Sequence, residues 1–445
     1  MYKKIFLPDE VKKALDIIHK NGFEGYIVGG CVRDSLMGIN PKDYDITTSA
    51  LPEQTKQIFK EYRVIETGIK HGTVTVLINK YPLEITTYRI DAEYKDNRHP
   101  DYVTFTLSLE EDTARRDFTM NSIAYNEENG IVDFHGGESD IKNKIIRCVG
   151  DPDKRFNEDA LRIMRAIRFS SVLGFEIEEH TKEAIFRNKE LLRNISAERI
   201  ASELIKLLCG SSVYSVLMEY IDVLGAVIPE LLPMKGFEQN NIHHIYDVWE
   251  HTAKAVESIE PTPILRLSAL FHDIGKPDTY IEKNGMGHFY GHANVSCEIT
   301  KNILDRLKLD NYTKDTVLQI VKLHDFPIKD NRFAVKKFLN KHSPEMLFMV
   351  LKMKRADDLA KNPFVLERLS TFDKIEQIGN EILQEQTCFS LKDLAVKGGD
   401  LIAIGFEPGK EIGIVLKKLL DAVIAERIPN EKEQLINFAK GLKNH

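Results

Sequence analysis

Three aspartates, an arginine and two adjacent glycines are found in one short stretch, VGGCVRDSLMGINPKDYDIT, residues 28–47. Asp43 and Asp45 lie two positions apart just before a β-prone run, and in a strand such residues project from the same face. Two carboxylates held side by side repel each other unless a cation neutralises them, and Mg²⁺ prefers such oxygens together with substrate phosphates. The pair therefore indicates either a magnesium site that acts on phosphate compounds or the polar edge of an ordinary turn.

The residues before this pair are suited to phosphate binding. Gly29 and Gly30 lack side chains, so a phosphate could approach the backbone N–H groups there. Arg33 follows in what we expect to be the first turn of a helix, from which its guanidinium could make a bidentate phosphate contact. The ordered combination of G-G, R-D and D-x-D is far more specific for a nucleotide site than D-x-D alone.

A second polar group follows in ARRDFTMNSIAY, residues 114–125. Asp117 can accept a hydrogen bond from a ribose hydroxyl, which a deoxynucleotide could not supply, and Arg115 and Arg116 can bind phosphate. The alternative is a structural one, because Arg–Asp pairs also cap and brace helices.

The third group, NEDALRIMR, carries residues that could read a nucleobase. Glu158 and Arg162 are spaced i,i+4 and Asp159 and Arg162 i,i+3, so one helix would present all three on one face. A carboxylate accepts from an exocyclic amino group and a guanidinium donates to a ring nitrogen or carbonyl, which would admit cytosine and adenine but not uracil and guanine. Otherwise the spacing is a surface ion pair worth only about 0.3–0.5 kcal/mol.

Histidines and aspartates recur in the C-terminal half in the order H…HD…H…H…D, with ALFHDIGK as the most distinctive part. Neutral imidazoles and carboxylates on adjacent helices can hold one or two divalent ions and activate water. The set consists of His251, His272, Asp273, His292, His324 and Asp357, with Asp358 as an alternative to Asp357.

The elements that must position these groups change along the chain. Residues 1–147 alternate helical and strand patterns: DEVKKALDIIHKNG is an amphipathic helix ended by Gly22, whereas GYIVGG, TVTVLI, LEITTY and YVTFTL are β-rich. From about Asp151 the pattern is almost wholly helical. We therefore expect an α+β fold, with a mixed-sheet head followed by an all-helical neck, body and tail.

Composition limits the class of protein. With 445 residues, 42% hydrophobic and 29% charged, the chain is globular and long enough for two to four domains. No window approaches the roughly 18 consecutive apolar residues of a membrane span, so we expect no membrane partner. Five scattered cysteines without a C-x-x-C pair favour a reducing, cytoplasmic location. The net charge of −7 allows an RNA partner without requiring one.

The stretches GGCVRDSLMG…KDYDI, RRDFTMNSIAY and DPDKRFNEDALRIMRAIRF together resemble the bacterial class II tRNA nucleotidyltransferases, the CCA-adding enzymes, whose superfamily also contains poly(A) polymerases. The resemblance implies that Asp43 and Asp45 bind catalytic Mg²⁺. It matches Glu84 in LEITTYR to a third acidic catalytic position, although a solvent-facing glutamate is the other interpretation. It also implies nucleotide binding by Gly29, Gly30, Arg33, Arg115, Arg116, Asp117, Asn121, Glu158, Asp159, Arg162 and Arg165.

The resemblance implies four domains along the chain. They are a nucleotidyltransferase catalytic head (1–147), a helical neck and body for nucleobase selection and tRNA binding (148–240), an HD phosphohydrolase domain (241–365) and a tRNA-binding helical tail (366–445). The histidine set resembles HD phosphohydrolases, which implies a site for Mg²⁺, Mn²⁺, Ni²⁺ or Co²⁺ and activity on 2′,3′-cyclic phosphates or phosphomonoesters.

The expected function is metal-dependent transfer of CMP and AMP from CTP and ATP to the 3′ end of tRNA. Residues 89–119 are polar, contain Pro100 and are predicted to form a mobile loop. In the family, enzymes that add only CC are shortened there, so the length favours CCA or A addition. The alternatives are an A-adding enzyme or poly(A) polymerase, or chiefly an HD phosphohydrolase whose head binds RNA.

Overall fold

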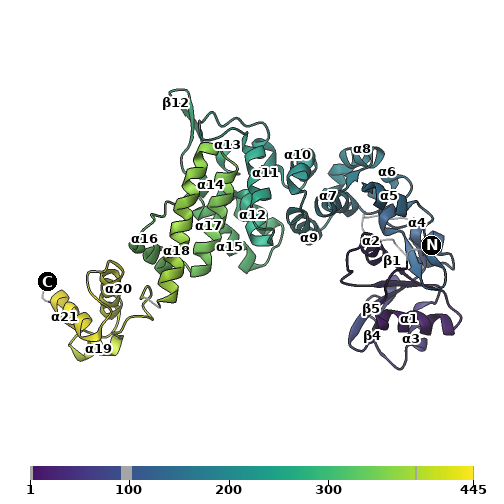
Figure 1. The fold of residues 1–445 in the computed structure, drawn as a ribbon, viewed down its shortest axis with the longest axis horizontal. Helices are drawn as coiled ribbons and strands as arrows, with labels where there is room; N and C mark the ends of the chain where they lie inside the picture. Colours follow the sequence, from purple (N-terminus) through teal and green to yellow (C-terminus); the bar gives the residue numbers. More distant parts are fainter. Residues whose placement is uncertain (1–3, 92–102, 386–387, 444–445) are drawn as a thin grey trace. The chain divides into compact units, whose positions relative to one another are not determined.

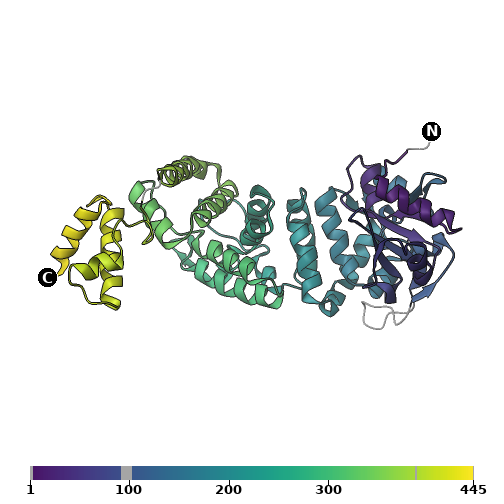
Figure 2. The same cartoon turned by 90° about the horizontal axis from the view of Figure 1, so that it is seen from below.

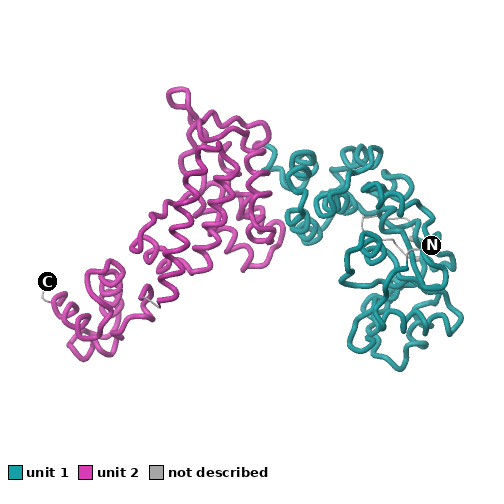
Figure 3. Tube along the Cα trace, in the orientation of Figure 1, with its two compact units in different colours: residues 1–232 teal, residues 233–445 magenta. Residues whose placement is uncertain are grey.

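The computed structural model describes residues 4–91, 103–385 and 388–443. It contains two compact units, Met1–Leu232 and Pro233–His445, which are described separately (Figure 3). The predicted four-domain division is finer than these two units, and its boundaries stay a prediction.

A mixed sheet of seven strands, in the order β3-β4-β5-β2-β1-β8-β9, forms the centre of the head (Figure 1). The strands β2 and β5 are parallel, and the other neighbours are antiparallel. The bounds are β1 Gly25–Val28, β2 Asp45–Thr48, β3 Arg63–Ile65, β4 Thr73–Ile78, β5 Tyr81–Thr87, β8 Ala124–Asn126 and β9 Gly130–Val132, with β6 Arg89–Asp91 and β7 Val103–Phe105 as a separate pair.

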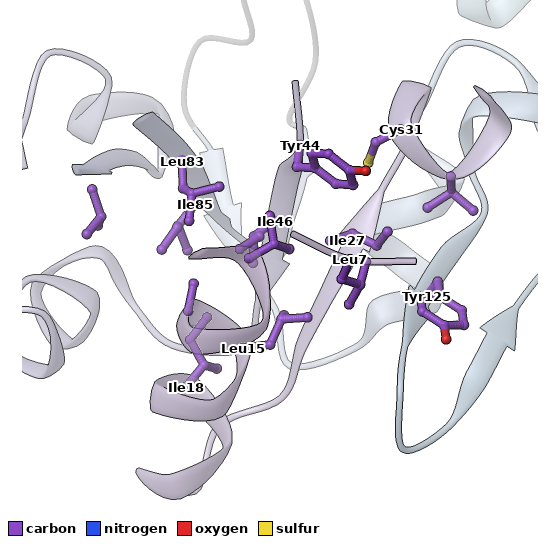
Figure 4. Packing of buried hydrophobic residues seen from close by; sticks show 14 of the residues in the cluster. Leu7, Leu15, Ile18, Ile27, Cys31, Tyr44, Ile46, Leu83, Ile85 and Tyr125 are labelled. Atoms are coloured by element: carbon purple, nitrogen blue, oxygen red, sulfur yellow. The ribbon is translucent and has the colours of Figure 1, made fainter. Parts of the chain in front are cut away.

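Helix α1 (Asp9–Lys20) packs on this sheet through its apolar face (Figure 1, Figure 2). Leu15 and Ile18 of α1 belong to one buried cluster with Ile27 of β1 and Ile46 of β2 (Figure 4). Gly22 (φ 81°) follows the helix as predicted, because a residue without a Cβ adopts positive φ freely. Burial of these side chains, at about 25 cal/mol per Å² of apolar surface, holds the strand edge that carries the polar motifs.

The remaining elements of the first unit are mostly helical. They are α2 Gly30–Leu36, α3 Pro52–Ile58, η1 Ile69–His71, α4 Leu109–Ala114, η2 Thr119–Asn121, α5 Gly137–Asn143, α6 Pro152–Glu158, α7 Leu161–Leu173, α8 Glu179–Asn188, η3 Lys189–Asn194, α9 Ala197–Leu208, α10 Val213–Leu224 and η4 Pro229–Met234, plus the parallel pair β10 Ile145–Ile146 and β11 Glu176–Ile177.

The second unit is a set of packed helices with one hairpin. Its elements are α11 Val248–Ser258, α12 Pro263–Phe271, α13 Lys276–Thr279, β12 Tyr280–Lys283, β13 Met286–Phe289, α14 His292–Arg306, α15 Asn311–Leu323, α16 Arg332–Lys341, α17 Pro344–Leu359, η5 Pro363–Arg368, α18 Leu369–Gln384, α19 Gly398–Ala403, α20 Lys410–Ile424 and α21 Lys432–Lys443. The last three helices share a buried cluster of their own, which includes Leu401, Leu419 and Leu435.

The mixed-sheet head and the helical remainder agree with the expected α+β architecture. The expectation of an all-helical remainder is wrong at two places, because the β12–β13 hairpin and one strand of the β10–β11 pair lie beyond residue 147. The predicted loop over residues 89–119 is also too long. Residues 89–91 and 103–105 pair as strands and residues 109–114 form a helix, while residues 92–102 lie outside the described part. No helix in the described residues is both long and apolar enough to span a bilayer.

Candidate active site and metal centre

Three carboxylates lie near the start of β2, an inner strand of the head sheet. Asp45 opens β2 with its side chain exposed between buried Tyr44 and Ile46, and the parallel register of β2 and β5 sets Asp45 opposite Glu84. Asp43, two residues before Asp45, is also exposed. Loss of hydration raises the pKa of the Asp45 carboxyl, and the charges of Glu84 and Asp43 raise it further against the opposing effect of Arg116.

These three carboxylates fit a cation, because a divalent ion would relieve the repulsion that helps to raise the pKa of Asp45. The parallel register brings Glu84 beside the strand that carries Asp45, an adjacency that the sequence left open. Within the described residues, however, these three carboxylates are not among the groups whose ligand atoms all lie within 4.8 Å of one another.

Gly29 leaves space for the side chain of Arg116, and its backbone N–H is already hydrogen-bonded within the protein. Its N–H donates to the Ile123 carbonyl at 3.2 Å, so the expectation that this N–H faces phosphate is wrong. Gly29 has φ 84°, and a Cβ there would lie 3.1 Å from Nη1 of Arg116. The absence of a side chain therefore leaves room for the Arg116 guanidinium at the end of β1.

A hydrogen-bonded chain links Arg33 to the predicted ribose-sensing motif. Nη1 of Arg33 donates to Oδ1 of Asn121 at 2.8 Å, and Nδ2 of Asn121 donates to Oδ1 of Asp117 at 3.1 Å. Arg165 closes the chain, with Nε and Nη2 donating to Oδ2 of Asp117 at 2.8 and 2.6 Å. The structure thus brings together four predicted residues that are as many as 132 positions apart, from Arg33 to Arg165.

Asp117 is saturated by these partners. The Phe118 N–H donates to Oδ1 at 2.8 Å, in addition to Asn121, so each carboxylate oxygen accepts two hydrogen bonds. Burial by itself would raise the pKa of Asp117, but the Arg165 charge and the hydrogen bonds lower it to about 2. A ribose hydroxyl would therefore have to displace or share one of four donors.

The predicted base-reading helix is broken at Asp159. Helix α6 ends at Glu158, and Asp159 is extended (φ −138°, ψ 101°) before α7 begins at Leu161. The Oδ1 atom of Asp159 accepts from the Leu161 N–H at 3.1 Å, and such a short-range bond competes with continuation of the helix. The expectation that three residues share one helical face is therefore wrong for Asp159.

Glu158 and Arg162 do form the expected pair, with 2.8 Å between Oε2 and Nη1. Arg162 is buried and also donates to the backbone carbonyls of Arg155 and Arg115, at 3.2 and 2.9 Å. Asp159 is instead held by a residue that the sequence reasoning missed. Nη2 of Arg199, on α9, lies 2.7 Å from Oδ2 of Asp159, and Nη1 lies 3.2 Å from Oδ1.

Asp112 is a second residue that the sequence reasoning missed. Its fully buried carboxylate accepts from Thr47 Oγ1 on β2 at 3.0 Å, and from Nε and Nη2 of Arg115 at 3.0 and 2.8 Å. Burial would raise the pKa of Asp112, but Arg115 and Arg116 lower it below its ordinary value. Asp112 therefore ties the strand that carries Asp45 to the predicted phosphate-binding arginines, and no local pattern signals it.

The predicted histidine set converges in the second unit. His251 lies on α11, His272 and Asp273 follow α12, His292 begins α14, His324 follows α15, and Asp357 lies near the end of α17. Two groups of ligand atoms lie within 4.8 Å of one another, and these groups are His251, His272, Asp273 and Asp357, and Asp273, His292 and His324. All six residues are buried except Asp357, which is at the limit of burial.

Asp273 joins the two groups. Its Oδ2 lies 3.2 Å from Nε2 of His251 and 3.1 Å from Nε2 of His272, while its Oδ1 lies 3.3 Å from Nε2 of His292 and 3.7 Å from Nε2 of His324. Oδ1 of Asp357 lies 3.1 Å from Nε2 of His251. Burial would lower the pKa of His272, but Asp273 and Asp357 raise it to about 9.

The outer nitrogen of every ring is fixed by a backbone carbonyl. Nδ1 lies 3.0 Å from Ala360 O in His251, 2.8 Å from Ala269 O in His272, 2.9 Å from Phe289 O in His292 and 2.6 Å from Val321 O in His324. Each Nδ1 is therefore placed to donate to its carbonyl, and Nε2 faces the centre, where a metal ion would take the place of an Nε2 proton. These residues fit a pair of divalent ions that share Asp273.

The choice between Asp357 and Asp358 is also visible. Asp357 faces His251, whereas Oδ1 of Asp358 pairs with Nζ of Lys361 at 3.1 Å and its Oδ2 lies 3.7 Å from Nε of Arg368. A cavity of about 280 Å³ opens beside the cluster, lined among others by His244, Lys276 and Tyr290. Nζ of Lys276 lies 2.7 Å from Oδ2 of Asp273 and neutralises part of the acidic charge.

Comparisons with known proteins agree along the whole chain. Family models match at residues 25–147 ("Poly A polymerase head domain"), 174–234 ("Probable RNA and SrmB- binding site of polymerase A") and 288–439 ("tRNA nucleotidyltransferase domain 2"). CCA-adding enzymes of Ligilactobacillus salivarius and Bacillus velezensis are each 34% identical to the chain, over 98% and 99% of it and 98% and 100% of their own lengths.

Solved structures give the same result. The crystal structure of the Bacillus stearothermophilus CCA-adding enzyme in complex with CTP matches with a TM-score of 0.71 and 29% identity, over 99% of this chain and 98% of that one. The Thermotoga maritima CCA-adding enzyme complexed with tRNA, at 20% identity and a TM-score of 0.59 over 97% and 94%, shares the fold.

Proposed function

The chain belongs to the family of CCA-adding enzymes, and from this membership we propose that it transfers CMP and AMP from CTP and ATP to the 3′ end of tRNA. The observation that carries the proposal is the pairing of Asp45 with Glu84 in the head sheet, in the same compact unit as the Arg33–Asn121–Asp117–Arg165 chain. Acids that can hold metal and a fixed array of cations are what a nucleoside triphosphate needs.

In this reaction the 3′-hydroxyl of tRNA attacks the α-phosphate of the nucleotide, and pyrophosphate leaves. Mg²⁺ held by Asp43 and Asp45, with Glu84 beside them, would neutralise phosphate charge and favour ionisation of the hydroxyl. Arg33 is held in place by Asn121 and by Asp34, whose Oδ1 accepts from Nε and Nη2 of Arg33 at 2.9 and 2.7 Å. The guanidinium of Arg33 is therefore oriented before the triphosphate binds.

We assign base selection to Asp159 and Arg162. Each is fixed by a charged partner, Arg199 for Asp159 and Glu158 for Arg162, so the carboxylate and the guanidinium are oriented without a nucleic-acid template. An acceptor beside a donor matches the amino group and ring nitrogen of cytosine and adenine. The tRNA would be bound through its backbone and shape rather than by sequence.

The test is incorporation of each nucleotide into tRNA that lacks its 3′-terminal CCA. We expect C and A to be added, U and G to be rejected, and the tail to stop at CCA. The double variant Asp43→Ala, Asp45→Ala should lose all addition. Long A tails would identify a poly(A) polymerase, A without C would identify an A-adding enzyme, and either result would refute the CCA assignment.

The histidine cluster favours a second activity, metal-dependent hydrolysis of phosphoesters. We propose that one divalent ion (Mg²⁺, Mn²⁺, Ni²⁺ or Co²⁺) is bound by His251, His272, Asp273 and Asp357, and a second by Asp273, His292 and His324. Such ions would supply a nucleophilic hydroxide at neutral pH and charge stabilisation of the phosphate. Lys276 would limit the negative charge that meets the substrate.

Metal content and hydrolysis test this second proposal separately from nucleotide addition. Asp273→Asn should reduce the metal bound to metal-depleted protein titrated with Mn²⁺ and abolish hydrolysis of p-nitrophenyl phosphate, while addition of C and A continues. The Asp43→Ala, Asp45→Ala variant should show the reverse pattern. Hydrolysis that survives both a chelator and Asp273→Asn would exclude the cluster as its site.

A further inference from the structure

A cavity of about 400 Å³ adjoins the histidine cluster on the side formed by α15, α17 and α18. Its lining includes His324 and Asp357, which belong to the cluster, so a molecule bound in the cavity would reach the proposed metal centre. The volume is within the range of about 300–1,000 Å³ that is typical of small-molecule sites. The cavity is distinct from the smaller one that contains Lys276 and Tyr290.

Three cations line this cavity, and they are Lys354, Lys361 and Arg368. Lys361 is neutralised, since its Nζ lies 2.6 Å from Oδ2 of Asp357 and 3.1 Å from Oδ1 of Asp358. Lys354 is not: its Nζ donates to the His324 carbonyl at 2.6 Å, and within the described chain no carboxylate oxygen lies within 4.0 Å of it. An ammonium has three donors, so Lys354 keeps two for a ligand.

Arg368 is the second cation with donors to spare. Among the residues that the structure describes, its one contact with an acid is from Nε, 3.7 Å from Oδ2 of Asp358, and 61% of its side chain is exposed. The lining also includes the apolar side chains of Phe372 and Ile375 on α18. A cavity lined by both cations with spare donors and an aromatic ring suits a phosphorylated nucleoside.

We propose that this cavity binds a second phosphate group of the substrate of the cluster. The preferred substrate is then a nucleotide with phosphates on two sugar oxygens, as in a nucleoside 3′,5′-bisphosphate or at the 3′-phosphorylated end of an RNA. This inference rests on the phosphohydrolase activity proposed above. A simple phosphomonoester would occupy only the metal centre and leave Lys354 and Arg368 without a ligand.

The reaction is hydrolysis of one ester. Water attacks phosphorus at the cluster, the bond between phosphorus and the sugar 3′-oxygen breaks, and that oxygen takes a proton as it leaves. Inorganic phosphate is released. The second phosphate remains on the sugar and holds the product in the cavity until it dissociates.

Selectivity of hydrolysis is the first test. With Mn²⁺ present, we expect kcat/KM for adenosine 3′,5′-bisphosphate to exceed that for adenosine 3′-monophosphate by about tenfold, the value of one charged hydrogen bond. Arg368→Gln and Lys354→Gln should each remove most of this preference for the bisphosphate over the monophosphate. Lys374→Gln, an exposed lysine on α18 that does not line the cavity, is the control.

A short RNA with a 3′-phosphate, assayed in parallel, shows whether the substrate is a free nucleoside bisphosphate or the end of an RNA. A higher kcat/KM for the RNA identifies an RNA end, and a higher value for the free bisphosphate identifies a nucleotide. Equal kcat/KM for the monophosphate and both two-phosphate substrates would overturn the proposal, as would an Arg368→Gln variant that slows all three equally.

Binding without metal separates failure of this inference from failure of the hydrolytic function. In the presence of a chelator, titration calorimetry of adenosine 3′,5′-bisphosphate should show a Kd about tenfold weaker for Arg368→Gln than for the wild type or Lys374→Gln. The head is identical in all three proteins, so any binding of the bisphosphate to the head contributes equally to the three titrations and does not affect the comparison. If Arg368→Gln leaves the Kd unchanged, the phosphate subsite is refuted even if p-nitrophenyl phosphate is hydrolysed. If Arg368→Gln weakens binding but the protein hydrolyses no phosphoester, the subsite is supported and the hydrolytic function is refuted.

Discussion

Phe169 is expected to act as a positioning residue for the arginines of the head. Its buried ring has the guanidinium carbons of Arg168, Arg33 and Arg165 at 3.6, 5.0 and 5.5 Å from its centroid. Each such contact is worth about 0.5–2 kcal/mol, and it is strongest where water is excluded. Replacement by leucine keeps an apolar side chain but removes the aromatic face that attracts all three cations.

We expect Phe169→Leu to cost about 2 kcal/mol more in the free energy of unfolding than Phe118→Leu, the matched control. Phe118 is equally buried and packs edge-on against Phe169, at 5.9 Å and 87°, so both variants lose one ring from the same core. The cation contacts to Phe169 account for the difference. Urea unfolding at pH 7 measures both values.

The same change should impair nucleotide binding, because Arg33 and Arg165 lose part of what orients them. We expect KM for CTP to rise about tenfold, equivalent to about 1.4 kcal/mol, with a smaller effect on kcat. Phe169→Tyr, which keeps the ring, should restore KM. If Phe169→Leu and Phe118→Leu have the same stability and the same KM, the cation contacts contribute nothing and the reasoning fails.

Three further predictions follow from the ion pairs and the cluster. Ionised Asp117 stabilises the fold by about 2 kcal/mol because its pKa is about 2 instead of 3.8. This contribution is complete above pH 4 and is lost as the pH falls to 2. In urea unfolding, the difference in stability between the wild type and Asp117→Asn should therefore shrink between pH 4 and pH 2 and stay constant above pH 4. Arg199→Ala frees Asp159 and should lower kcat/KM for ATP at least tenfold while that for UTP changes little; a uniform loss for both would contradict a role in base selection. Mn²⁺ at 100 times its Kd should stabilise metal-depleted protein by about 2.7 kcal/mol, which would be measured as a higher Tm. The Asp273→Asn variant should not show this increase. An unchanged Tm in the wild type would disprove metal binding by the cluster.

Local sequence patterns were sufficient to identify the motifs and most of the elements that carry them. The alternation around Asp45 and the helix before Gly22 depend on periodicities of two and 3.6 residues, which neighbours along the chain determine. The ordered histidines and aspartates were recognisable for the same reason, since their residue types alone suit a metal. The sequence alone therefore determined which residues make up the polar motifs and the metal-binding set.

Their partners were decided only by the tertiary structure. Glu84 comes beside Asp45 through a parallel strand register, and Arg199 reaches Asp159 from another helix 40 residues away, so neither pairing leaves a local signal. Spacing rules assume an unbroken helix, and they failed at Asp159 because its side chain bonds the backbone that the helix would have used. Asp357 and Asp358 are chemically alike and adjacent, and only the packing of α17 against α11 turns Asp357 toward His251, while Asp358 lies outside the metal-ligand group.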